Sequence, residues 1–125
     1  MKVEVSIGEL VDKVSILSIK LEKMKDPEKL KNVQNEYDAL VPSMIETGVT
    51  VESDEFARLR EINLQLWEIE DQLRLKEVAS CFDDEFIKLA RGVYFTNDER
   101  AAIKKEINLK FGSELVEEKE YVDYK

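Results

Sequence analysis

The chain has 125 residues, of which 43% are apolar and 38% are charged, and its formal net charge is −9. That length suits one domain, residues 1–125. So acidic a chain argues against nucleic acid or an anionic membrane as a partner, because both need a basic surface. There is no histidine and one cysteine, Cys81, which excludes a Ser-His-Asp triad, a histidine metal site and an internal disulfide. The lone cysteine, and the lack of a signal-like or membrane-spanning run, predict a cytoplasmic protein.

The first predicted helix covers residues 6–25. Ser6 and Glu9 have the spacing of a capping box at its start. Apolar residues then recur at alternating three- and four-residue spacing, which is typical of a coiled-coil seam; they are Ile7, Leu10, Val14, Leu17, Leu21 and Met24. Further apolar residues widen this seam beyond what one neighbouring helix needs. We therefore expect a homodimer or higher homo-oligomer formed by helix packing.

A second helix is predicted over residues 27–41, antiparallel to the first. Asp26 suits the N-cap, and Pro27 suits the first helical position while keeping Asp26 out of the α region. Pro42 is expected to end this helix, because a proline ring disrupts a helix interior. Short β pieces are expected at the N-terminus, over residues 2–5, and at residues 49–51.

The longest predicted helix covers residues 53–79. Ser53 is its expected N-cap, and the acidic residues that follow suit the positive end of the helix dipole. One apolar face is formed by residues spaced three and four apart; they are Leu59, Ile62, Leu66, Ile69 and Leu73. No glycine or proline interrupts the run, so this central helix is expected to organise the rest of the chain.

Two shorter helices are predicted to follow, over residues 83–95 and 98–111. Asn97 is the expected cap that separates them, and Gly112 the expected stop. The charge-rich tail, residues 113–125, is expected to dock as an arm or short strand. Taken together, the patterns predict an all-α fold with an N-terminal helical hairpin, a long central helix, two shorter helices and minor β pieces.

Acidic residues offer one possible site. Glu52 and Glu55, followed by Glu68 and Asp71, match the paired acidic motifs of all-α nucleoside triphosphate pyrophosphatases, which hold Mg²⁺ between facing helices. Here Glu55 and Glu68 would lie about 20 Å apart along one helix, so a single ion cannot bridge them. Glu68, Glu70 and Asp71 remain candidate ligands for Mg²⁺ or Mn²⁺, with a solvated acidic helix face as the alternative.

Basic residues offer a second possible site, for an anion. Its candidate residues lie near the turn expected at Asn97; they are Arg91, Asn97, Arg100 and Lys104. Arginine suits bidentate contacts with phosphate, and exposed backbone N–H groups at a helix start would add to them. The alternative is structural: Arg74, Arg91 and Arg100 would pair with acidic residues, namely Glu70, Asp71, Glu117 and Glu118.

Several segments together resemble an uncharacterised family of short, mostly helical proteins of bacteria and their viruses, a domain of unknown function. They are residues 6–13, 66–71, 89–91, 93–94, 97–104 and 112–119. Gly92, Phe95 and Ser18 depart from the more usual polar residues of that family. Some members occur beside surface-polysaccharide biosynthesis proteins, so the resemblance implies a nucleotide-sugar or glycan context.

The resemblance brings no established activity and no catalytic residues. It marks polar positions as a candidate site or a buried ion-pair network; they are Asp12, Lys13, Glu70, Asp71, Arg91, Asn97, Asp98, Arg100, Lys104 and Lys119. Two functions are therefore weighed. The favoured one is a non-catalytic, oligomerising helical module that binds a partner protein and needs no cofactor. The alternative is a Mg²⁺- or Mn²⁺-dependent hydrolase or binder of nucleotides or nucleotide-sugars.

Overall fold

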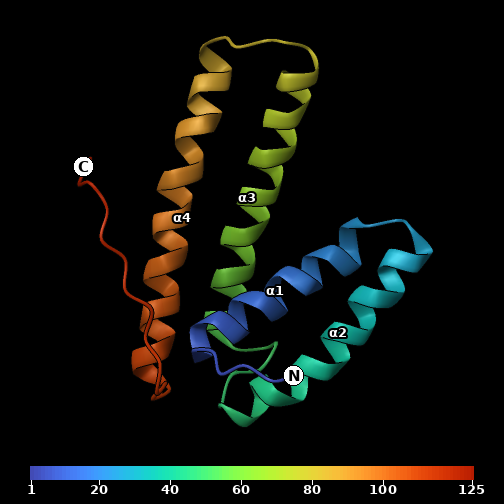
Figure 1. Cartoon of the computed structure of the whole chain (residues 1–125), viewed down its shortest axis with the longest axis vertical. Coiled ribbons are helices and arrows are strands. Elements are labelled where there is room, and N and C mark those ends of the chain that lie inside the picture. The colour runs from blue at the N-terminus through green and yellow to red at the C-terminus, as the bar shows by residue number, and fades with distance from the viewer.

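A computed structural model describes all residues, 1–125, and contains four helices and no strand, which confirms the all-α prediction (Figure 1). The helices are α1 (Ile7–Lys23), α2 (Pro27–Glu46), α3 (Asp54–Val78) and α4 (Asp84–Lys110). Helices α3 and α4 form a long antiparallel hairpin. The shorter α1–α2 hairpin crosses it near one end, and the C-terminal tail runs back beside α4.

Side-chain caps lie at the starts of α1, α2 and α4, whereas Ser53, the predicted cap of α3, occupies the N-cap position without a capping hydrogen bond. Ser6 Oγ accepts a hydrogen bond from the Glu9 N–H at 3.1 Å, and the Asp26 carboxylate accepts from the first turn of α2, whose first residue is a proline. Asp83 caps α4 by accepting from the Phe86 N–H at 2.9 Å. Because each cap involves residues close in sequence, the starts of the first two helices could be predicted.

Two predicted helix ends are wrong. Helix α2 does not stop before Pro42 but continues to Glu46. The extra turn places Met44, which is fully buried, among core residues of the other helices. Burial of such a side chain stabilises the fold by about 2 kcal/mol, which helps offset the backbone hydrogen bond lost at the proline.

The predicted break at Asn97 is also absent, since α4 is one helix of 27 residues. The Asn97 side chain accepts a hydrogen bond from Arg100, one turn further on, and caps no helix end. Continuity lets α4 pack along α3 and still reach α1 with Ile103 and Ile107, both of which are buried. Tertiary packing has overridden a local cap signal here.

The predicted β pieces are absent as well. Residues 2–5 are exposed and have no regular structure, and residues 49–51 lie in the connection between α2 and α3. Val49 is fully buried there and belongs to the core. The apolar character of residues 49–51 therefore serves to bury Val49 in the core, and no strand pairing is involved.

Helix α1 is the hub of the packing, since it lies against each of the other three helices, whereas α2 lies against α1 alone. The buried apolar core joins all four helices; its members are Val11, Val14, Met44, Val49, Phe56, Leu59, Ile62, Leu66, Ile103 and Ile107. These residues lie near the crossing of the two hairpins. The far half of the α3–α4 hairpin therefore extends past the core. No helix combines the length and the apolar character needed to cross a membrane.

Candidate functional site

The start of α1 is held by side chains from both ends of the chain. Its first three N–H groups all donate to side-chain oxygens. Ser6 provides the local cap, Asn108 Oδ1 accepts from Gly8 at 2.6 Å, and Ser113 Oγ accepts from Ile7 at 3.0 Å. These bonds satisfy the orphan donors of the helix start, so this end of α1 has no free N–H group with which to bind an anion.

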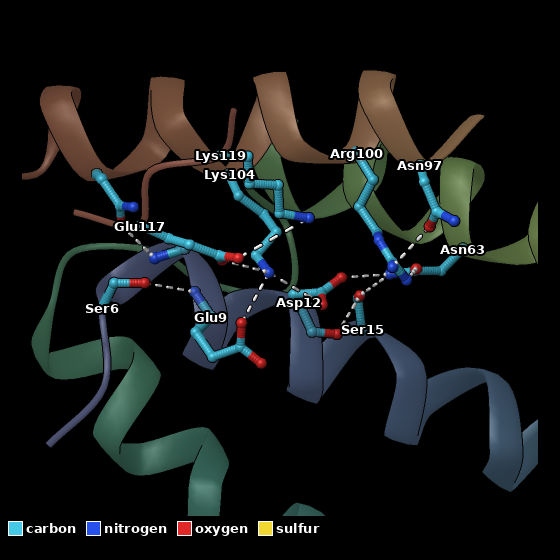
Figure 2. Close-up of polar contacts among 12 residues, drawn as sticks. Ser6, Glu9, Asp12, Ser15, Asn63, Asn97, Arg100, Lys104, Glu117 and Lys119 are labelled. Carbon is cyan, nitrogen blue, oxygen red and sulfur yellow. Dashed lines mark hydrogen bonds and ion pairs between the residues drawn. The ribbon is translucent and has the colours of Figure 1, made fainter. Parts of the chain in front are cut away.

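Lys104 forms the centre of a polar network between α1, α4 and the tail (Figure 2). Its ammonium group lies 2.7 Å from a Glu9 oxygen, 3.8 Å from Asp12 and 3.5 Å from Glu117. Burial alone would lower the pKa of Lys104, but the Glu9 hydrogen bond and the nearby carboxylate charges outweigh it and raise the pKa. Lys104 therefore stays charged and connects α4 to α1 and to the tail through ion pairs.

Asn63 adds helix α3 to this network and connects it to Arg100. Its amide donates to Asp12 Oδ1 at 2.8 Å and to Ser15 Oγ at 2.9 Å, while its oxygen accepts from Arg100 at 3.2 Å. Asn63, Asp12 and Ser15 are all buried. Every buried side-chain nitrogen and oxygen in the protein has a hydrogen-bond partner, as stable interiors require.

Arg100 differs from the other arginines that join helices. Arg58 pairs with Glu106 at 2.7 Å, and Arg60 pairs with Glu22. The partly buried guanidinium of Arg100 instead donates to two neutral amide oxygens, those of Asn63 and Asn97, and forms no ion pair. Arg100 is held in place by these bonds without a direct ion pair to a carboxylate.

A pocket lies between α4 and the tail, beside Arg100. It has a volume of about 460 Å³. Residues from α4 and residues from the tail line it together; they are Tyr94, Asn97, Asp98, Arg100, Lys119, Tyr121, Val122 and Tyr124. We call it the tail pocket. Tyr124 anchors the tail here by packing edge-on against the rings of Tyr94 and Phe95, with centroids 5.0 and 5.1 Å away.

Residues 1–124 match a protein family described as a family of unknown function, DUF6165. The chain belongs to that family. The match confirms the resemblance to an uncharacterised domain, while the bacterial and polysaccharide context stays an expectation. Comparisons with curated proteins and with solved structures found no match. The role of this DUF6165 protein therefore has to be inferred from its own residues.

The predicted anion-binding residues of this DUF6165 chain are only partly together. Asn97 and Arg100 are hydrogen-bonded to each other at 2.7 Å and line the tail pocket. Lys104, one turn further along α4, is occupied by three carboxylates. Arg91 is exposed and lies over the Phe95 ring, 5.9 Å from its centroid. Asp98 and Lys119, which the family resemblance marks as candidate positions, also line this pocket, whereas the two tail tyrosines were not among the predicted site residues.

The predicted metal ligands lie on α3 without other acids close enough to complete a site. Glu68, Glu70 and Asp71 are all exposed. Glu70 and Asp71 pair with Arg74 at 3.9 and 3.5 Å, as the structural alternative for Arg74 expected. No group of three or more acidic or cysteine side chains is placed to hold a metal ion within one chain. The single chain therefore does not bring the three predicted ligands together with a further acid or cysteine.

The docking of the tail is expected to depend on alkaline pH through Tyr124. Its hydroxyl donates to the Asp98 carboxylate, and this hydrogen bond, with burial, raises the pKa of Tyr124 from 10.0 to about 12. Because only the protonated phenol can donate, this stabilisation is fully present below pH 10.0 and is lost as the pH rises through about 12.

Tyrosinate absorbance of the wild type, compared with Tyr124→Phe, isolates the titration of this one residue. The Asp98→Asn variant, which keeps an acceptor but removes the charge, should return the pKa of Tyr124 towards 10.0. A wild-type Tyr124 that already titrates at its ordinary value would contradict the docked position of the tail.

Proposed function

We propose that this protein is a non-catalytic, oligomerising interaction module whose first partner is a second copy of the same chain. The observation that carries this proposal is a set of large apolar side chains left uncovered at the tip of the α3–α4 hairpin. They are Leu75, Val78, Phe82 and Ile87. Clusters of this kind on a soluble surface are typical of protein–protein contact sites.

The total surface area supports association. The chain exposes 8605 Å² at a mass of 14.5 kDa. A compact monomer of that mass exposes roughly 6,900 Å², so the excess is about 1,700 Å². A stable interface buries about 800 Å² on each partner. The chain as a whole therefore has enough surplus surface to form one and still leave the core unchanged.

Charges on the hairpin also favour a second copy. Glu68 on α3 has no ion-pair partner, and neither do Lys88 and Arg91 on α4, although the chain forms ion pairs elsewhere along both helices. In a two-fold dimer, α3 of one copy can lie against α4 of the other and bring these opposite charges together. Such a contact is self-complementary, because each copy supplies both the acidic and the basic side.

The hydrolase alternative has less support. The three acids proposed as Mg²⁺ or Mn²⁺ ligands point outward, and two of them are already paired with Arg74. No third acid or cysteine lies close enough to join these residues in a metal-holding cluster within one chain. The interaction module needs no such assembly of ligands and accounts for the exposed tip directly.

The proposal predicts a dimer or higher oligomer at micromolar concentration by analytical ultracentrifugation. Leu75→Glu combined with Val78→Glu should give a monomer, because charges would then have to be desolvated in the interface. The matched control is Leu109→Glu, since Leu75 and Leu109 are each 69% exposed but lie at opposite ends of the α3–α4 hairpin. A monomeric wild type, or equal dissociation by both variants, would overturn the proposal.

A further inference from the structure

The tail pocket brings cationic, aromatic and acidic side chains together in one hollow. Its floor is α4, with Tyr94, Asn97 and Arg100, and its other side is the tail, with Lys119 and Tyr121. Two separate stretches of the chain, within residues 94–100 and 119–124, therefore share one hollow only because the tail is docked. Pockets that hold small molecules are typically about 300–1,000 Å³, so 460 Å³ is sufficient for one.

The cations in the tail pocket lack strong partners. Arg100 donates only to amide oxygens, as described above. The Lys119 ammonium has one carboxylate neighbour, Glu117, at 3.8 Å, which is beyond hydrogen-bond distance. In a chain of net charge −9, most cations that join segments find an acid. Two under-compensated cations lining one pocket indicate that an anion can bind there.

The other residues that line the tail pocket indicate which further chemical groups a ligand should carry. Three tyrosine rings, Tyr94, Tyr121 and Tyr124, offer flat apolar surface for stacking. Asp98 is the one acid in the pocket; it accepts the Tyr124 hydroxyl and has further lone pairs for ligand hydroxyl groups. A matching ligand therefore carries a phosphate, hydroxyl groups and a flat ring.

We propose that the tail pocket binds a nucleoside monophosphate or a close chemical relative. The phosphate contacts Arg100 and Lys119, the sugar hydroxyls donate to Asp98, and the base stacks on the tyrosine rings. Arg100 is suited to this role because Asn63 and Asn97 already hold its guanidinium in position, so less side-chain freedom is lost on binding. This inference concerns a different surface from the hairpin tip and does not depend on oligomerisation.

Ligand binding and tail docking should stabilise each other, since the tail supplies half of the pocket. A molecule that contacts both sides binds the docked tail better than the free tail, and linkage then requires it to favour docking. Chymotrypsin cleavage after Tyr121 or Tyr124 should accordingly slow when the ligand is present. A ligand held elsewhere on the protein would leave this cleavage rate unchanged.

The test is a titration of the full chain with uridine monophosphate or adenosine monophosphate, in which amide chemical shifts are monitored by two-dimensional NMR. We expect saturable shifts at Asn97, Asp98 and residues 119–124. Uridine alone and inorganic phosphate alone should each bind about tenfold more weakly than the monophosphate. Saturable shifts located elsewhere, equal binding of uridine and its monophosphate, or no saturation at millimolar concentration would overturn the proposal.

Variants separate the binding role from a structural one. Lys119→Ala should weaken monophosphate binding about tenfold, and the fold should be unaffected because this side chain makes only a long contact with Glu117. Lys105→Ala is the matched control, because Lys105 also contacts a tail acid, Glu118 at 3.2 Å, but lies outside the pocket. Unchanged affinity in Lys119→Ala, or equal loss in both variants, would contradict the proposed site.

Discussion

Replacing Lys104 with methionine is expected to lower the free energy of unfolding by about 3 kcal/mol. The Asp12 side chain is only 7% exposed, and Lys104 is the one cation paired with it. Methionine keeps most of the apolar stem but leaves a buried carboxylate without a positive neighbour, which is costly. Urea unfolding followed by circular dichroism would measure the change, with the urea dependence of the unfolding free energy expected to stay the same.

Two further variants test the cause. Lys105→Met removes the neighbouring cation, whose side chain is 50% exposed and paired with an exposed acid, Glu118; the change should stay within about 0.5 kcal/mol. Adding Asp12→Asn to Lys104→Met should recover part of the loss, because an amide oxygen can still accept from Asn63 without carrying a charge. If Lys104→Met and Lys105→Met lowered the free energy of unfolding equally, burial of the ion pair would not be the cause of the destabilisation.

The Gly8→Ala substitution is expected to destabilise the protein by a similar amount, about 3 kcal/mol. A Cβ at this position would lie 2.6 Å from the Lys104 carbonyl oxygen and 3.0 Å from Asn108 Oδ1. The carbonyl is helix backbone and cannot rotate away, so α1 would have to move off α4. That movement would also break the Gly8–Asn108 hydrogen bond.

Gly92→Ala is the matched control, with an effect of opposite sign. A Cβ there meets only the end of the Ile69 side chain, at the ordinary contact distance of 3.5 Å. Since alanine favours a helix interior over glycine by about 1 kcal/mol, this variant should be more stable than the wild type. Thermal unfolding of both variants gives the comparison. Destabilisation by Gly92→Ala as large as that by Gly8→Ala would mean that the close approach at Gly8 is not the cause.

Helix positions were predicted well where the deciding interactions are local. The capping pattern at Ser6, the proline at position 27 and the apolar face of α3 all involve residues within a few positions of one another, and the corresponding helices are present. The errors at Pro42 and Asn97 have one physical origin. In both places, burial of core residues further along the helix outweighs a local signal to stop.

The candidate site was predictable only in part, because its contacts are distant in sequence. The pairing of Arg74 with acids three and four positions earlier follows from helix geometry. Nothing local, in contrast, indicates that Lys104 meets Glu9, which is 95 positions away. The tail pocket was harder still to foresee, since the position of the tail depends on a few side-chain contacts, chiefly those of Tyr124.

The capping of α1 by Asn108 and Ser113 has a consequence for the order in which the chain folds on the ribosome. Helix α1 is translated first, yet two of the partners for its opening N–H groups lie about 100 positions later. The nascent α1–α2 hairpin must therefore emerge with an open helix end and an incompletely covered apolar seam. Its native start can close only when the end of α4 and the first tail residues have been synthesised. Until then, this segment exposes apolar surface that the finished fold covers, and such surface favours aggregation of incomplete chains.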